Sequence, residues 1–218
     1  MPDALILGFD TSAAHCAAVL LSGDRVLVDR HEDMAKGQAE RLMPLLEEVL
    51  AEAAVGWRDL AALGVGIGPG NFTGIRIAVS AARGLALSLG VPAVGVSTLE
   101  AQAFGVPGVV VSSLDARRDG LYVQAFWTGA HSSPVLCDIQ TLPPIPAGAE
   151  PSCVGHRNDE IAALCAGHPV TVQMSGAQAI AHIAHSRMHI LDLPRPAPLY
   201  LRGADAAPSR DLAPAILP

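Results

Sequence analysis

Few stretches of this sequence restrict its fold as strongly as a glycine-rich turn that opens directly into a long apolar helix. The turn spans residues 68–74, Gly-Pro-Gly-Asn-Phe-Thr-Gly, and follows an apolar run at 63–67 that predicts a strand. This order of strand, turn and helix presents backbone N–H groups to an anion or to a closely docked surface. The turn lacks a Gly-Lys-Ser/Thr ending, and Gly68, Gly70 and Gly74 only approximate the G-x-G-x-x-G spacing, so the phosphate signal is weak.

Composition indicates a packed globular protein. The chain has 218 residues, of which 50% are apolar, 16% are charged and 4% are aromatic, so the core must be built mainly from Ala, Val, Leu and Ile. The net charge of −7 predicts a poor unaided binder of nucleic acid and favours a basic partner surface.

The sequence shows no recognisable membrane-spanning or signal-peptide pattern, which predicts a cytoplasmic protein. No segment reaches the roughly 20 apolar residues that span a bilayer. The N-terminus has no basic region of the kind that begins a signal peptide. The four cysteines form no C-x-x-C pair, which is typical of reduced thiols.

The first half of the chain has a regular pattern of alternating elements. Strands are predicted at 4–9, 17–21, 26–28, 63–67 and 94–96, and helices at 42–53, 73–89 and 97–104. Pro44 is expected to bend the first helix or to mark its first turn. A hairpin followed by strands joined through helices predicts a mixed sheet in an α/β layer fold.

The second half is less regular. Two strands at 109–114 and 121–127 are joined by a charged turn at 115–120, and the proline-rich residues 134–151 are expected to form a loop or an irregular edge strand. Helices are predicted at 158–166 and 176–189, with a strand at 170–172. With a boundary near 105–108, these elements predict an N-terminal lobe at 1–106 and a smaller C-terminal lobe at 107–218 that ends in an extended, proline-rich tail.

Two such halves predict the two-lobed actin-like, Hsp70-like (ASKHA) fold, with mixed sheets flanked by helices and a reduced second lobe. In that architecture an acidic residue and a hydroxyl follow the first strand, and here Asp10, Thr11 and Ser12 stand at that place. These residues could hold a metal-bound nucleotide phosphate, and a hydrogen-bonded turn is the alternative. The predicted phosphate contacts are Asp10, Thr11, Ser12, Gly70, Thr73 and Gly74.

Two further clusters could carry chemistry. His182, His185 and His189 share one face of a predicted helix, which could bind Zn²⁺ or could simply face solvent; no metal site is predicted. The turn containing Asp115, Arg117, Arg118 and Asp119 is either a solvated turn or a binding loop.

The two early helices carry apolar or small residues on more than one side. This pattern predicts burial against a partner, and simple burial between layers is the alternative. The predicted interface consists of Leu42, Met43, Leu46, Leu50, Ile75, Val79, Ala82 and Ala86.

The full string from Gly68 to Ile77, followed by Ala-Arg-Gly-Leu-Ala at 82–86, resembles the bacterial TsaB family. Similar motifs are Leu-Gly-Phe-Asp-Thr-Ser at 7–12, Arg-Leu-Met-Pro-Leu at 41–45 and Val-Gly-Val-Ser-Thr-Leu-Glu at 94–100. The segments Leu-Asp-Ala-Arg-Arg at 114–118 and Pro-Leu-Tyr-Leu-Arg at 198–202 also fit. The resemblance covers most of residues 5–127 and is thin over 128–197.

The resemblance implies a non-catalytic scaffold for TsaD, the paralogue that transfers a threonylcarbamoyl group to adenosine 37 of tRNA. TsaD binds its metal through a histidine pair, whose positions correspond here to Thr98 and Gln102, and neither side chain replaces imidazole. The early helices would pair with those of TsaD, or with a second copy in a homodimer. TsaE would join through the complex, and tRNA would be contacted only indirectly.

The resemblance leaves several points open. No tightly bound cofactor is implied, but ATP or ADP could lie at the partner interface. Gln38 stands where relatives often have His, which leaves that position without an assigned role. The alternatives are an independent actin-like ATPase or kinase that uses Asp10 and Thr11, and a metallopeptidase.

Overall fold

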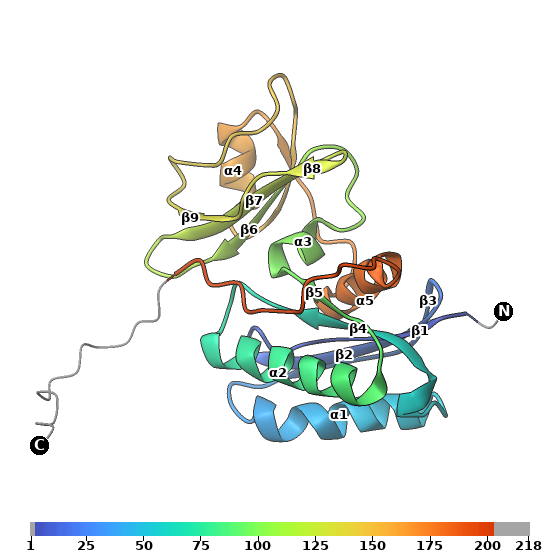
Figure 1. The fold of residues 1–218 in the computed structure, drawn as a ribbon. Coiled ribbons are helices and arrows are strands. Elements are labelled where there is room, and N and C mark those ends of the chain that lie inside the picture. Colours follow the sequence, from blue (N-terminus) through green and yellow to red (C-terminus); the bar gives the residue numbers. More distant parts are fainter. Residues whose placement is uncertain (1–2, 203–218) are drawn as a thin grey trace, which may run out of the picture.

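The computed structural model describes residues 3–202, which form two lobes, each built around one sheet (Figure 1). The first sheet has the strand order β3-β2-β1-β4-β5. Its strands are β1 (Leu5–Asp10), β2 (His15–Ser22), β3 (Arg25–Asp33), β4 (Leu60–Gly66) and β5 (Ala93–Val96). The first three strands form an antiparallel meander, and β4 and β5 run parallel to β1, as the sequence pattern predicts.

Helices cover both faces of the first sheet (Figure 1). Helices α1 (Gln38–Glu52) and α2 (Phe72–Leu89) lie side by side on one face, and α5 (Gly176–Arg187) lies on the other. Successive residues of β1 divide between the two layers, because Leu7 and Phe9 pack with α1 and α2 while Ile6 packs with α5. Burial on both faces explains why β1 and β2 are almost continuously apolar.

Helix α5 packs closely against the sheet because the strands have glycines, Gly8 and Gly64, at the contact. A Cβ added at Gly8 would lie 2.7 Å from the Cβ of Ala181, and one at Gly64 would lie 2.8 Å from the carbonyl oxygen of Ile180. The short α3 (Thr98–Ala103) lies between α5 and the second sheet and so links the lobes (Figure 1).

The second lobe contains a smaller sheet with the order β11-β10-β6-β7-β8, and β9 also pairs with β7. Its elements are β6 (Val110–Asp115), β7 (Leu121–Trp127), β8 (Ala130–His131), β9 (Val135–Cys137), β10 (Ser152–Gly155), α4 (Asn158–Leu164) and β11 (His168–Pro169). Strands β6 and β7 match the predicted pair, and the predicted 134–151 loop contains β9. The strand β10 was missed because its four residues carry no alternating pattern.

Three sequence predictions need correction. A division at residues 106 and 107 separates α5 from the sheet on which it packs, so the first lobe includes a helix from the end of the chain. The strand predicted at 170–172 is wrong, because β11 ends at Pro169. Pro44 does not mark the first turn of α1, which begins at Gln38 and continues through the proline. The tail predicted from Pro194 onward forms no helix or strand over residues 194–202, and its remainder from 203 lies outside the described residues.

Two arginines link the edge strand β3 to α1, Arg30 through Glu52 and Arg41 through Glu32. The guanidinium of Arg41 donates to both carboxylate oxygens of Glu32 at 2.6 and 2.7 Å and to those of Glu48 at 2.6 and 2.7 Å. These hydrogen bonds lower the pKa of both carboxyl groups and raise the pKa of Arg41.

We therefore expect the Arg41→Gln variant to lose stability in a pH-dependent way. Because the folded pKa of Glu32 lies below its ordinary value of 4.5, the stabilisation is present above pH 4.5 and disappears as the pH falls through the folded pKa. The melting temperatures of the two proteins should differ at pH 7 and converge toward pH 3. Arg58→Gln, at an exposed position with no ion pair among the described residues, is the control. A constant difference across the pH range would contradict this account.

Candidate functional site

The turns that follow β1 and β4 pack against each other at the carboxyl edge of the first sheet. The amide of Asn71 donates to the carbonyl oxygen of Ser12 at 2.6 Å, and the Thr11 hydroxyl donates to the carbonyl oxygen of Gly74 at 2.7 Å. A Cβ at Gly70 would collide with the Ser12 carbonyl, and one at Gly74 would collide with the Thr11 carbonyl. The glycines are therefore required for direct contact between the two turns.

Asp10 already has hydrogen-bond partners within the chain. Its carboxylate accepts from the Ser12 amide at 3.0 Å and from the Ser12 hydroxyl at 2.8 Å, and His15 Nε2 lies 2.9 Å away. Asp10, Thr11 and Ser12 are all buried, whereas Gly70 and Thr73 are exposed. The structure thus brings the six predicted phosphate contacts together where the two turns meet. Phosphate binding at this junction stays a prediction.

Thr98 and Gln102 also bond within the chain. Gln102 accepts a hydrogen bond from the Ser112 hydroxyl at 3.0 Å, and Thr98 lies 3.4 Å from the Ser12 hydroxyl. Among residues 3–202, no group of three or more His, Cys, Asp or Glu side chains is arranged to hold a metal ion. The metallopeptidase hypothesis therefore has no ligand set in this part of the chain.

The three histidines predicted on one face do not converge. His182 and His185 flank Asp24, with Nδ1 to Oδ1 distances of 3.9 and 3.6 Å, and the His182 ring stacks on Phe104. His189 lies beyond the end of α5 and is exposed. His182 and His185 are partly buried, with side chains 18% and 29% exposed, so of the three histidines the solvated alternative fits His189 alone.

Most of the predicted interface is core. Six of the eight side chains are at most 3% exposed and pack against the first sheet: Leu42, Leu46, Leu50, Ile75, Val79 and Ala82. The prediction that they contact a partner is wrong, because the apolar stripe of each helix is already covered by the sheet. Met43 is 37% exposed and Ala86 is partly buried, so these two remain at the surface.

The outer face of α2 carries residues that the sequence reasoning missed. Leu87 is 87% exposed, a Cβ added at Gly84 would meet no atom within 4 Å, and Ser80 and Arg83 are exposed on the same side of the helix. No acidic residue occurs in α2. Leu87 could have been noticed as an apolar residue outside the stripe that faces the sheet.

A second missed feature clamps the end of the described chain to the start of α2. The Arg76 guanidinium lies 3.9 Å above the Phe72 ring, and Arg76 Nε donates to the Tyr200 hydroxyl at 2.7 Å. The amide of Leu199 donates to the carbonyl oxygen of Ile67 at 2.8 Å. No local pattern links Arg76 with Tyr200, because 124 residues separate them.

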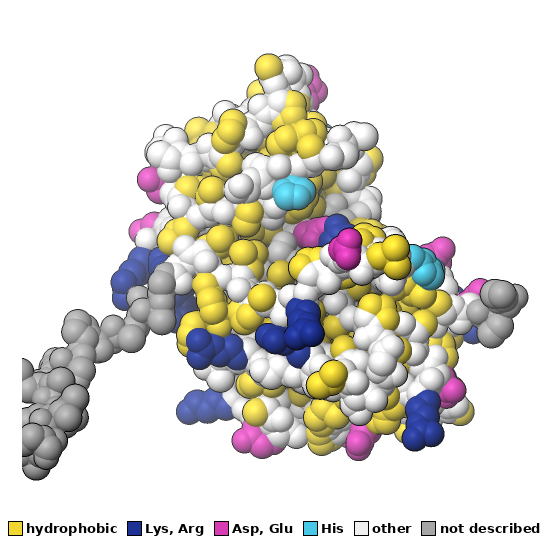
Figure 2. Space-filling view, viewed as in Figure 1, with side chains coloured by type: hydrophobic (Ala, Val, Ile, Leu, Met, Phe, Trp, Pro, Cys, Tyr) yellow, Lys and Arg dark blue, Asp and Glu magenta, His cyan; other side chains and the backbone are white. Residues whose placement is uncertain are grey.

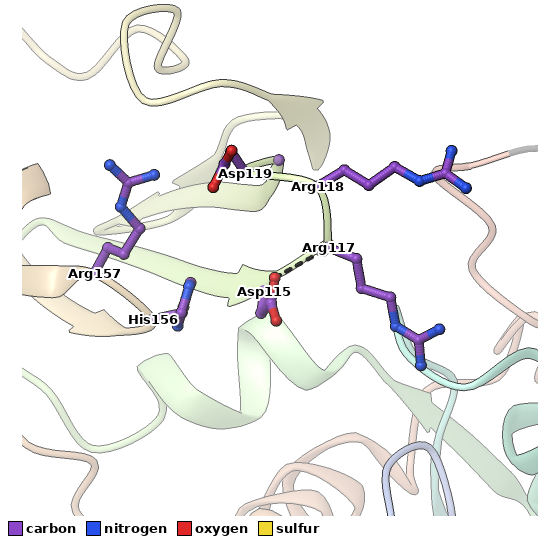
Figure 3. A pocket seen from close by; sticks show the side chains of 7 residues that line it. Asp115, Arg117, Arg118, Asp119, His156 and Arg157 are labelled. Atoms are coloured by element: carbon purple, nitrogen blue, oxygen red, sulfur yellow. Dashed lines mark hydrogen bonds between the residues drawn. The ribbon is translucent and has the colours of Figure 1, made fainter.

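The charged turn between β6 and β7 borders a pocket of about 410 Å³ (Figure 3). His156 and Arg157 line its other side, and Arg157 is paired with Glu160 at 2.7 Å. Arg117, Arg118 and Asp119 have positive φ angles of 62°, 53° and 60°, an uncommon backbone for residues other than glycine. Two backbone hydrogen bonds close the turn, from the Ala116 amide to the Gly120 carbonyl at 3.0 Å and from the Gly120 amide to the Arg117 carbonyl at 3.1 Å.

Comparison with known proteins identifies the family. A protein of Mycobacterium tuberculosis, Rv3421c, is uncharacterized and 32% identical over 93% of this chain and 94% of its own length. Escherichia coli TsaB, a tRNA threonylcarbamoyladenosine biosynthesis protein, is 37% identical over 45% of this chain. The chain belongs to the TsaB family.

Further comparisons agree with this assignment. The family model for TsaD, tRNA N6-adenosine threonylcarbamoyltransferase, matches residues 32–132 of this TsaB chain. A Pseudomonas aeruginosa crystal structure, described as similar to peptidase YeaZ, superposes with a TM-score of 0.72 at 27% identity. It covers 91% of this chain and 100% of its own, and the actin-like fold is thereby confirmed. The match to the E. coli protein spans 42% of that relative, so this chain covers less than half of its length.

In this TsaB chain, replacing the glycine at the junction of the turns should destabilise the fold. Gly74→Ala places a methyl group against the Thr11 carbonyl, so we expect a loss of about 3 kcal/mol or more in the free energy of unfolding. Gly84→Ala is the matched control in the same helix and should stabilise by about 0.5–1 kcal/mol. Equal effects of the two substitutions in urea unfolding would contradict the packing described.

The buried hydroxyl at the junction gives a second, milder test. Thr11→Val keeps the shape of the side chain and removes its hydrogen bond to Gly74, so unfolding should become easier by about 1–2 kcal/mol. Thr73→Val, at an exposed position on the same turn, should change stability by less than about 0.5 kcal/mol. Thermal unfolding of both variants measures the difference, and equal melting temperatures would contradict a structural role for Thr11.

Proposed function

We propose that this chain is a non-catalytic accessory subunit that binds TsaD and supports threonylcarbamoyl transfer to adenosine 37 of tRNA. The proposal follows from TsaB family membership and from the similarity of residues 32–132 to the TsaD model. It is also supported by Thr98 and Gln102, which stand where TsaD is expected to carry its metal-binding histidines.

The observation that carries this proposal is the uncovered outer face of α2. Leu87 projects almost entirely into solvent, and Ser80, Gly84 and Ser88 follow one another at intervals of four residues. Small residues at this spacing let a second helix approach closely, and a leucine can then insert between its side chains. With Met43 from the adjacent α1, these residues form what we term the docking face: Met43, Ser80, Arg83, Gly84, Leu87 and Ser88.

The docking face also explains how one surface could serve two assemblies. A paralogue with the same fold presents an equivalent pair of helices, so TsaD and a second copy of this chain would compete for the face. TsaE would then join through the complex. We further propose that any ATP or ADP binds at the junction with the partner, since the hydrogen-bonding groups of Asp10, Thr11 and Ser12 are already engaged within this chain.

Leu87→Asp should remove partner binding without unfolding the isolated chain. The leucine is exposed in the free protein, whereas in the complex the carboxylate would be buried against an apolar surface. We expect TsaD binding to weaken at least about thirtyfold, as at other central interface residues. Co-purification with TsaD compares the variant with the wild-type chain. A tRNA modification assay with TsaD and the wild-type chain, the variant or neither chain measures the effect on activity.

Two further variants separate docking from folding. Leu164→Asp is the matched control, because Leu164 is 53% exposed on α4 in the other lobe and should leave TsaD binding unchanged. Leu46→Asp should unfold the chain, because Leu46 is fully buried in the core. Full complex formation by Leu87→Asp would refute the assignment of the docking face.

A further inference from the structure

Arginines from distant parts of the sequence gather at the edge where the two lobes meet. The turn at 115–120, the start of α2 and the end of the described chain lie close together on the left of Figure 1. Dark-blue side chains collect on this side of the surface in Figure 2. We term this surface the basic edge, and its cations are Arg76, Arg117, Arg118 and Arg202.

The cations of the basic edge are not neutralised within the described chain. Arg30, Arg41, Arg157 and Arg187 each pair with a glutamate, but no carboxylate among residues 3–202 forms an ion pair with the four arginines of the edge. Much of the negative charge lies elsewhere, for example on the exposed residues Glu40, Glu47, Glu48 and Glu52 of α1. The net charge of −7 therefore conceals a local positive surface.

Two carboxylates in the turn need separate consideration. Asp115 accepts a hydrogen bond from the amide of Arg117 at 2.7 Å, and Asp119 lies on the side of the turn facing Arg157. Arg117 and Arg118 also line the pocket, and their side chains reach to the side of the turn opposite Arg157 (Figure 3). The turn thus separates its anionic side from its cationic side.

Arg76 is held in place before any ligand arrives. Its guanidinium stacks on Phe72 and hydrogen-bonds to Tyr200, which leaves the terminal nitrogens without a hydrogen-bond partner among the described residues. Phe72 and Tyr200 are 38% and 42% exposed. Arginines beside half-exposed aromatic rings are typical of surfaces that bind a phosphodiester chain and stack on its unpaired bases.

We propose that the basic edge binds the phosphate backbone of the tRNA substrate, which rests on the function proposed above. Phe72 and Arg76 lie in the first turns of α2, and Leu87 lies near its end. At 1.5 Å per residue, Arg76 and Leu87 are about 16 Å apart along the helix, so the basic edge and the exposed leucine lie toward opposite ends of α2. This contact differs from the expectation that tRNA meets the subunit only indirectly.

The test is fluorescence anisotropy of labelled tRNA, titrated with the complex of this chain and TsaD at salt concentrations between about 50 and 200 mM. The Arg117→Gln/Arg118→Gln double variant and the Arg76→Gln variant remove charge at exposed positions. Each lost phosphate contact should weaken binding roughly five- to eightfold at 0.1 M salt and lower the salt slope by about one. The matched control for the double variant is Arg25→Gln/Arg58→Gln, which also removes two charges at exposed sites elsewhere and should not alter the slope.

The possible results separate RNA binding from partner binding. Wild-type affinity and salt slope in both variants would overturn the proposal. A second result would also overturn the proposal: the variants no longer co-purify with TsaD, yet each isolated variant binds tRNA as the isolated wild-type chain does. The basic edge would then be a contact with TsaD. Failure of the docking face would instead appear with Leu87→Asp, which leaves every arginine of the basic edge in place.

Discussion

The close contact between the turns after β1 and β4 determines how the first lobe is assembled. The amide of Asn71 and the hydroxyl of Thr11 bond across this junction, and Gly70 and Gly74 leave room for the opposing carbonyl groups. Because α2 begins at Phe72, immediately after the contact, the junction sets where the helix starts and in which direction it leaves the sheet. The position of the docking face and of Arg76 both depend on that direction.

The two sides of α2 have different surroundings. Its apolar stripe is used against the sheet, so the side that faces solvent carries Ser80, Gly84 and Leu87 instead. Burial of the inner side stabilises the lobe without a partner, which makes a folded free subunit compatible with docking of a second helix pair on the outer side. In the proposed assembly, folding and association use different residues of the same helices, so substitutions could alter them separately.

The end of the chain contributes to both lobes. Helix α5 returns to cover the first sheet, and the following segment crosses toward the β6–β7 turn, where Tyr200 holds Arg76 (Figure 1). This path brings the end of the described chain close to the β6–β7 turn, which is far away in the sequence (Figure 1). A protein that is acidic overall thereby acquires a basic edge, because charge is arranged by the path of the chain and not by composition.

The sequence by itself determined the local elements and the family. The strand-turn-helix at 63–89 and the meander of the first sheet follow from periodicity, glycine and proline, and the string from Gly68 to Ile77 resembles TsaB. Tertiary structure decided what covers each face: Leu46 and Val79 are core, Leu87 is exposed, and α5 belongs to the first lobe. Periodicity predicts that a helix has an apolar stripe, but it carries no information on whether a sheet of the same chain or a partner covers it. Contacts such as Arg76 with Tyr200 depend on the path of 124 residues, which no local pattern encodes.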